Sequence, residues 1–77
     1  MFIAEQKTEE AIAQYREAIR IKPDFVDVYN NWGIALLKEG KTQEAITRFE
    51  KALELKPDYA DARNNLEVAT RRGASVQ

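Results

Sequence analysis

The sequence predicts an all-α protein in which about four helices stack as repeated helix–turn–helix pairs. Three observations support this fold class. The chain matches itself at a shift of 34 residues, its apolar residues recur at the spacing of one helix face, and helix-breaking residues separate the apolar segments at regular places. At 77 residues the chain forms one domain at most, and a domain of this size has a marginal core.

The internal repeat keeps one register without a gap. At a shift of 34 residues, Glu10-Ala11-Ile12 aligns with Glu44-Ala45-Ile46, and Ile21-Lys22-Pro23-Asp24 aligns with Leu55-Lys56-Pro57-Asp58. The match continues until Ala35 meets Ala69. Chance does not maintain one register over such a length, so we interpret the chain as a repeat array.

The first and third expected helices, near residues 8–21 and 43–55, carry the same apolar face. That face consists of Ala11, Tyr15, Ala18 and Ile19 in the first helix and of Ala45, Phe49, Ala52 and Leu53 in the third. These residues lie at i, i+4, i+7 and i+8, which is one side of a helix. The small alanines allow a neighbouring helix to approach closely.

The second and fourth expected helices, near residues 26–39 and 59–72, complete the two pairs. Three breakers, each followed by a candidate N-cap, separate the four helices: Pro23 with Asp24, Gly40 with Thr42, and Pro57 with Asp58. Proline cannot continue a helix, glycine favours its end, and Asp or Thr favours the start of the next.

One complete repeat carries a family resemblance. The residues concerned are Tyr29, Trp32-Gly33, Leu36, Gly40, Ala45, Phe49, Ala52 and Pro57. With the 34-residue period they resemble the tetratricopeptide repeat family, although Tyr29 replaces the usual Trp and Trp32 stands where Leu is common. The resemblance implies helix–turn–helix repeats stacked as a short right-handed superhelix. It divides the chain into the second half of a truncated repeat (1–24), a complete repeat (25–58), a C-terminal capping helix (59–73) and a disordered tail (74–77).

The two ends of this array differ. In the last helix the polar residues Arg63, Glu67 and Thr70 stand where a further repeat would need an apolar face, which predicts a solvated cap with Gly73 as its stop. The first helix instead has an uncovered apolar flank, and exposed flanks of this kind usually mark an interface. The candidate self-association residues are Phe2, Ile3, Ile12, Tyr15 and Ile19.

Three interpretations of the open first helix compete. In the first, the sequence is a piece of a longer array. In the second, it forms a homo-oligomer, expected to be a dimer that can exchange helices. In the third, residues 1–3 fold back over the flank. The first two are compatible with each other.

The resemblance also implies a concave surface, lined by the first helix of each repeat, that commonly holds an extended peptide. The partner-binding residues expected there are Asp27, Asn30, Asn31, Ile34, Lys38, Asp61, Asn64, Asn65 and Arg72. Their Asn and Asp positions are similar to the ladders inside the O-linked N-acetylglucosaminyltransferase type of array. A side-chain amide can both donate to and accept from a bound backbone. The alternative is that these side chains only solvate a helix face or pair between helices.

Composition narrows the possible functions. The chain has no Cys and no His, and its only serine, Ser75, lies in the expected tail, so we expect no metal, no cofactor and no enzyme activity. The formal net charge of −1 comes from interspersed acids and bases, which argues against nucleic-acid binding. No apolar run could span a bilayer, so we expect no membrane contact and, by default, a cytoplasmic location. The expected partner is a protein or peptide.

Overall fold

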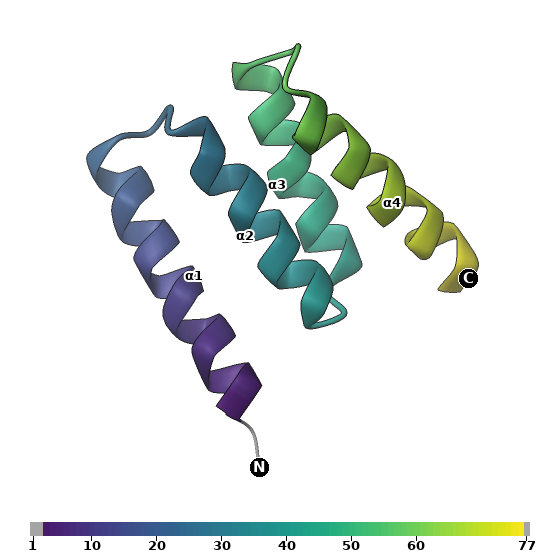
Figure 1. The fold of residues 1–77 in the computed structure, drawn as a ribbon, viewed down its shortest axis with the longest axis horizontal. Helices are drawn as coiled ribbons and strands as arrows, with labels where there is room; N and C mark the ends of the chain where they lie inside the picture. The colour runs from purple at the N-terminus through teal and green to yellow at the C-terminus, as the bar shows by residue number, and fades with distance from the viewer. Residues whose placement is uncertain (1–2, 77) are drawn as a thin grey trace.

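Four helices confirm the all-α fold in the computed structural model, which describes residues 3–76 and the side chains of residues 7–73. The helices are α1 (Ile3–Ile21), α2 (Val26–Lys38), α3 (Thr42–Leu55) and α4 (Ala60–Val76). They form a flat stack of 36 × 31 × 15 Å in which each helix packs against the next along the chain (Figure 1). In addition, α2 contacts α4, so α2 lies at the centre of the stack.

The turn between α2 and α3 depends on Gly40, as the sequence predicts. Gly40 has a φ of +77°, a conformation that a residue with a Cβ adopts only with strain. The turn is closed by backbone bonds from the N–H of Lys41 to the carbonyl of Leu36 (2.9 Å) and from the N–H of Gly40 to that of Leu37 (3.0 Å). The last carbonyls of α2 are thereby satisfied.

The predicted side-chain caps were wrong at α2 and α3. Phe25 and Lys41 occupy the cap positions there, and neither makes a capping bond through its side chain. In the turn before α2 the N–H of Phe25 donates to the carbonyl of Lys22 (3.1 Å), which places the helix start one residue beyond Asp24. Thr42 is already the first residue of α3.

The outer helices are both longer than expected. α1 begins at Ile3 rather than near residue 8, because Gln6, which stands 34 residues before Gly40, does not interrupt a helix as glycine in that conformation does. α4 continues past Gly73, its expected stop, to Val76. Among the described glycines only Gly40 has a positive φ, so Gly73 remains helical.

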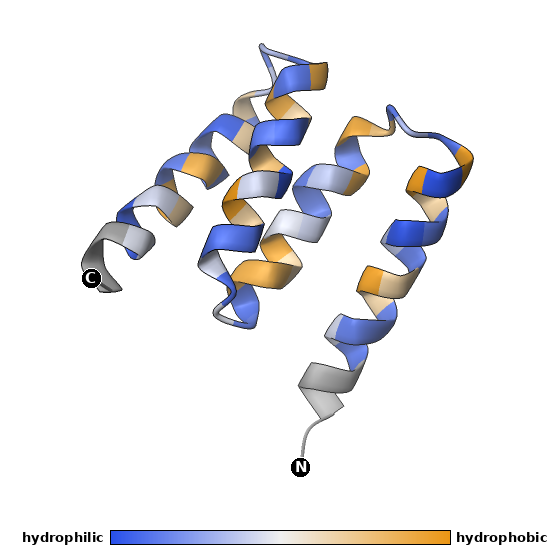
Figure 2. Ribbon diagram, turned by 180° about the vertical axis from the view of Figure 1, so that it is seen from behind, coloured by the Kyte–Doolittle hydropathy of each residue, from blue (hydrophilic) through white to orange (hydrophobic). Residues whose placement is uncertain are grey.

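The core lies between α2, α3 and α4 and uses the residues of the predicted repeat. One buried cluster contains Trp32, Leu36, Ala45, Phe49 and Ala69, and a second contains Tyr29, Ala52 and Ala62. The apolar positions alternate with polar ones along each helix (Figure 2). Phe49 is fully buried, which contributes roughly 1.5–3 kcal/mol.

Gly33 permits the closest approach between helices. A methyl group built on Gly33 would lie 2.4 Å from Cε1 of Phe49, far inside van der Waals contact. The backbone of α2 therefore rests directly on the ring of Phe49 in α3.

Equivalent residues of α1 and α3 differ in burial. Ala45, Phe49 and Ala52 of α3 are fully buried, because α2 and α4 both pack against this helix. Their counterparts in α1 are Ala11, Tyr15 and Ala18, and all three remain partly exposed. Of the other three helices α1 packs against α2 alone, so one flank of α1 has no helix beside it.

We predict that Gly33→Ala lowers the free energy of unfolding by about 1–3 kcal/mol, since the added methyl group overlaps a ring that has no space to move. Urea titration followed by circular dichroism measures this loss. Gly73→Ala is the matched control: there the nearest atom is the flexible Gln43 amide, 3.3 Å from the added carbon, and alanine is the better helix former. The control should leave stability unchanged or raise it by up to about 1 kcal/mol. Equal stability of Gly33→Ala and wild type would contradict the close approach.

Candidate functional site

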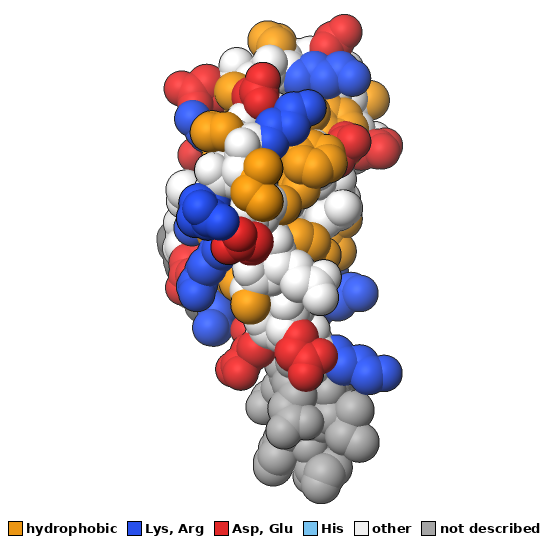
Figure 3. Space-filling model, turned by 90° about the vertical axis from the view of Figure 1, so that its left-hand side faces the viewer, with side chains coloured by type: hydrophobic (Ala, Val, Ile, Leu, Met, Phe, Trp, Pro, Cys, Tyr) orange, Lys and Arg blue, Asp and Glu red, His pale blue; other side chains and the backbone are white. Residues whose placement is uncertain are grey.

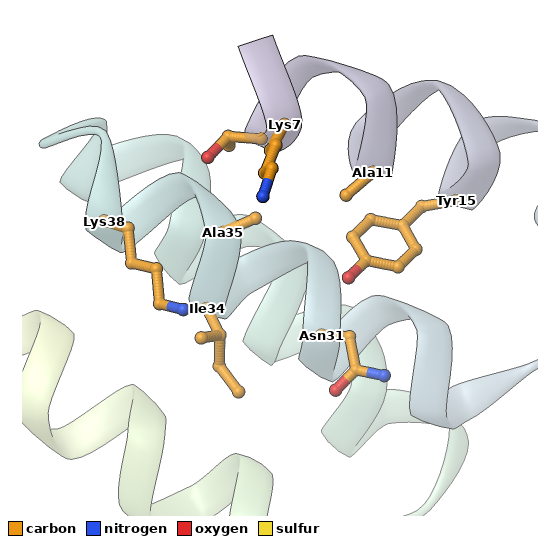
Figure 4. A pocket seen from close by; sticks show the side chains of 8 residues that line it. Lys7, Ala11, Tyr15, Asn31, Ile34, Ala35 and Lys38 are labelled. Atoms are coloured by element: carbon orange, nitrogen blue, oxygen red, sulfur yellow. The ribbon is translucent and has the colours of Figure 1, made fainter. Parts of the chain in front are cut away.

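A hollow of about 260 Å³ lies between α1 and α2 (Figure 4). Its lining residues are Lys7, Thr8, Ala11, Tyr15, Asn31, Ile34, Ala35 and Lys38. One side of each helix faces the hollow. Ala11 and Tyr15 are four residues apart on α1, and Asn31 and Ala35 are four apart on α2, so each pair lies on one helix face. We refer to this site as the α1/α2 hollow.

The chemistry of the α1/α2 hollow is mixed. The two alanines and Ile34 provide an apolar floor, and the ring of Tyr15 points from α1 toward α2 (Figure 4). Lys7 and Lys38 are exposed and bring two ammonium groups to its rim. The amide of Asn31 forms no hydrogen bond with any other described side chain or backbone group. The hollow can therefore accept an apolar group, a backbone amide and an acid.

Three of the predicted concave residues, Asn31, Ile34 and Lys38, are brought together in this hollow. Two others, Asn30 and Asn65, pair with each other. Asn30 is only 5% exposed, and its Oδ1 accepts a hydrogen bond of 3.0 Å from Nδ2 of Asn65, which ties α4 to α2.

The remaining predicted concave residues lie outside the hollow. Asp27 accepts a hydrogen bond of 2.9 Å at its Oδ1 from the hydroxyl of Tyr59. Asp61, Asn64 and Arg72 are exposed on α4. They share a helix with one another but do not line the α1/α2 hollow.

Four lining residues were not predicted: Lys7, Thr8, Ala11 and Ala35. The internal repeat contains a signal for them, because three of them align at 34 residues with Thr42, Ala45 and Ala69, and Lys7 aligns with Lys41. The pattern alone does not show that α1 and α2 leave a space at this place.

The predicted self-association residues are only partly accessible. Ile12, Tyr15 and Ile19 are half-buried, and each packs against the core. Phe2 lies outside the described residues, as does the side chain of Ile3, although Ile3 begins α1.

Trp32 is a packing residue in contact with two arginines. It is buried, and the guanidinium carbons of Arg48 and Arg16 lie 3.8 Å and 5.9 Å from its ring centroid. These contacts join α1 and α3 to α2 by cation–π attraction.

No helix of the described part is long and apolar enough to cross a membrane, and no cluster of acids there could hold a metal ion.

Tyr59 lies in the turn between α3 and α4, links that turn to α2, and has a shifted pKa. Burial raises the pKa of the Tyr59 hydroxyl above its ordinary 10.0, and the hydrogen bond to Asp27 and the charges of Asp27 and Asp61 raise it further. A raised folded pKa means that the folded state holds the proton more tightly than the unfolded state. The contribution to stability is therefore fully present below pH 10 and is lost as the pH rises through the raised pKa.

We predict that Tyr59→Phe is less stable than wild type at pH 7 by about 0.5–1.5 kcal/mol, the value of one hydrogen bond. Above pH 10 this difference should shrink, because the wild-type phenol then ionises beside Asp27. Urea unfolding of both proteins from pH 7 to 11 measures the difference. A difference that stays constant over this range would show that the hydroxyl does not act through Asp27.

Comparison with known proteins agrees with this geometry. A family model described as TPR repeat matches residues 1–40 and 33–69, which include α1, α2, α3 and most of α4. No curated protein matches the chain significantly. The chain therefore belongs to the tetratricopeptide (TPR) repeat family.

Proposed function

We propose that the chain is a non-catalytic interaction module that binds a segment of a partner protein in the α1/α2 hollow. TPR repeats serve as protein–protein interaction modules in general. The observation that carries the proposal is that Asn31, Ile34 and Lys38 share one hollow with the ring of Tyr15.

The side chains around the hollow suit a protein segment rather than a small polar molecule. An apolar side chain of the partner would displace water from Ile34 and the two alanines. The Asn31 amide can then donate to or accept from a partner amide, whether backbone or side chain. The two lysines favour an acidic residue nearby, although exposed ion pairs add little to affinity.

Asn31 and Asn65 occupy positions that are similar to the ladder of the O-linked N-acetylglucosaminyltransferase type of array, and of these two only Asn31 forms no hydrogen bond within the described part of the chain. Asn65 already donates to Asn30, whereas Asn31 is exposed and unpaired among the described residues. Asn31 is therefore the amide that we assign to partner binding.

We predict that Asn31→Ala weakens binding of a selected partner by about three- to tenfold, the effect of one lost hydrogen bond. Ligands for the full chain can be selected from a displayed library of random peptides and measured by calorimetry. The melting temperature should stay within about 2–4 °C, because surface substitutions away from internal contacts change the free energy of unfolding by at most about 0.5 kcal/mol. Asn64→Ala, exposed on α4, is the matched control and should bind like wild type. Selected peptides that bind Asn31→Ala with unchanged affinity would place the site elsewhere.

A second candidate function is self-association through the open flank of α1. On this side of the molecule hydrophobic side chains lie among charged ones (Figure 3). Ile12, Tyr15 and Ile19 of α1 are partly exposed although each packs against the core, and Ile21 at the end of α1 is 70% exposed. Apolar surface of this kind is stabilised when a second copy covers it.

We predict that the chain sediments as a dimer at micromolar concentration and that Tyr15→Glu yields monomers, because a carboxylate in this flank opposes its desolvation. Analytical ultracentrifugation over a dilution series measures the change. Val68→Glu, at a 40% exposed apolar position on α4, is the control and should remain dimeric. A wild-type chain that is monomeric at every concentration would rule out this function.

A further inference from the structure

Two arginines from different helices approach the single tryptophan of the chain. Trp32 belongs to α2 and is 7% exposed. The guanidinium carbon of Arg48, from α3, lies 3.8 Å from the centroid of its ring, and that of Arg16, from α1, lies 5.9 Å from it. In the described part of the chain α1 and α3 do not pack against each other, so the indole of α2 brings the two cations together. We call these three residues the Arg–Trp–Arg cluster.

Neither cation of the cluster is matched by an acid. Among the described residues, no carboxylate forms an ion pair with Arg16 or Arg48, and no acceptor takes a hydrogen bond from either guanidinium. Glu44 precedes Arg48 by four residues, a spacing at which opposite charges commonly pair on a helix, yet the guanidinium lies on the ring instead. Arg48 is half-buried, and its Nε is buried without an acceptor. The cluster thus holds two like charges beside one ring with their hydrogen-bonding capacity unused.

Packing of the repeat does not require this combination of side chains. One repeat later, Leu66 stands at the position of Trp32, and Glu50 stands at that of Arg16. Leu66 still packs against the core, so an ordinary aliphatic residue is sufficient at this position. The two cations and the indole are therefore a departure from the internal repeat rather than a part of its packing pattern.

We propose that the Arg–Trp–Arg cluster binds the carboxylates of an acidic segment of a partner protein. A carboxylate presents two oxygens in one plane, which matches the planar edge of a guanidinium, and an arginine stacked on an aromatic ring is already oriented for that contact. A bound anion also relieves the repulsion between the two cations. Its attraction to Arg48 is the stronger one, since a half-buried charge lies in a lower effective dielectric than an exposed one.

The cluster is separate from the α1/α2 hollow, with which it shares no lining residue. Trp32 belongs to the buried cluster that contains Phe49 of α3, whereas its neighbour Asn31 lines the hollow. The inference therefore goes beyond the proposed function and does not depend on it.

Trp32 serves as the reporter for the test, because the chain has no other tryptophan and indole emission responds to a charged group beside the ring. The full chain is titrated with a tetraglutamate peptide blocked at both ends. We expect a saturable change in emission with a dissociation constant of about 1 mM or below. Sodium chloride at about 0.5 M should weaken binding several-fold, because salt screens exposed charges. Inorganic phosphate at matched ionic strength is the second arm and should bind more weakly than the peptide.

Variants of the two arginines assign the response to the cluster. Arg48→Gln should weaken peptide binding at least about tenfold and Arg16→Gln about two- to fivefold, since an exposed cation contributes less. Arg48→Lys keeps a cation beside Trp32 but loses the planar fork, so its affinity should lie between those of wild type and Arg48→Gln. It also replaces Arg48→Gln as the test if that variant fails to fold. Lys51→Gln removes the same charge from an exposed position of α3 and is the matched control, expected to bind like wild type.

Three outcomes would each overturn the inference. The first is an unchanged emission at about 10 mM tetraglutamate. The second is an equal loss of binding in Lys51→Gln and in the Arg48 variants, which would indicate a diffuse effect of net charge. The third is tighter binding of phosphate than of the peptide, which would show that the cluster selects a tetrahedral anion instead of carboxylates. All three leave the proposed function of the hollow untouched, because its test relies on Asn31 and on different ligands.

Discussion

The rest of the structure depends on the contact between Gly33 and Phe49. Because Gly33 has no Cβ, the backbone of α2 lies on the aromatic ring, and the ring is completely removed from water. The same approach buries Ala45 and Ala52, one turn before and one turn after Phe49, which are small enough to lie under neighbouring helices. A rigid α2–α3 pair results, and α1 and α4 pack against its two sides. In a chain this short, such regular close packing replaces the disulfides or metals that other small domains require.

The number of neighbouring helices, rather than residue type, determines what each repeat position does. Phe49 and Tyr15 occupy the same position, yet the first is core and the second lines a hollow. Asn65 and Asn31 differ in the same manner, since Asn65 ties two helices together and Asn31 is exposed. The same repeat position is therefore buried or exposed according to whether its helix has neighbours on both sides. Both the candidate site and the self-association flank arise from this geometry around α1.

Much of the fold was predictable because, in a 34-residue repeat, the pattern of each helix occurs twice in the sequence. The periodic positions of Ala45, Phe49 and Ala52 identified the core, and Gly40 identified a turn that needs a positive φ. The helix ends were less predictable, since backbone hydrogen bonds, and not Asp24 or Thr42, close the turns. The site was predicted only in part. Asn31, Ile34 and Lys38 share a helix face that sequence reveals, whereas the contribution of Lys7 and Ala11 depends on how far α1 stands from α2. That separation is a tertiary property with no local signal.

One position also accounts for the difference between the two ends of the stack. In α2 this position holds Gly33, which lies on the ring of Phe49 in α3, and α1 packs against α2 as well. In α4 the same position holds Glu67, which is exposed. To stack a further aromatic ring there, the carboxylate would have to leave water together with the guanidinium of Arg71, which lies 3.7 Å from it, and this desolvation is unfavourable. A single glutamate in place of glycine thus converts an interface into a surface, while the fold of the helix is unchanged. The outer faces of the stack therefore differ in chemistry, since α1 carries partly exposed apolar side chains and α4 carries an exposed carboxylate at the position of Gly33.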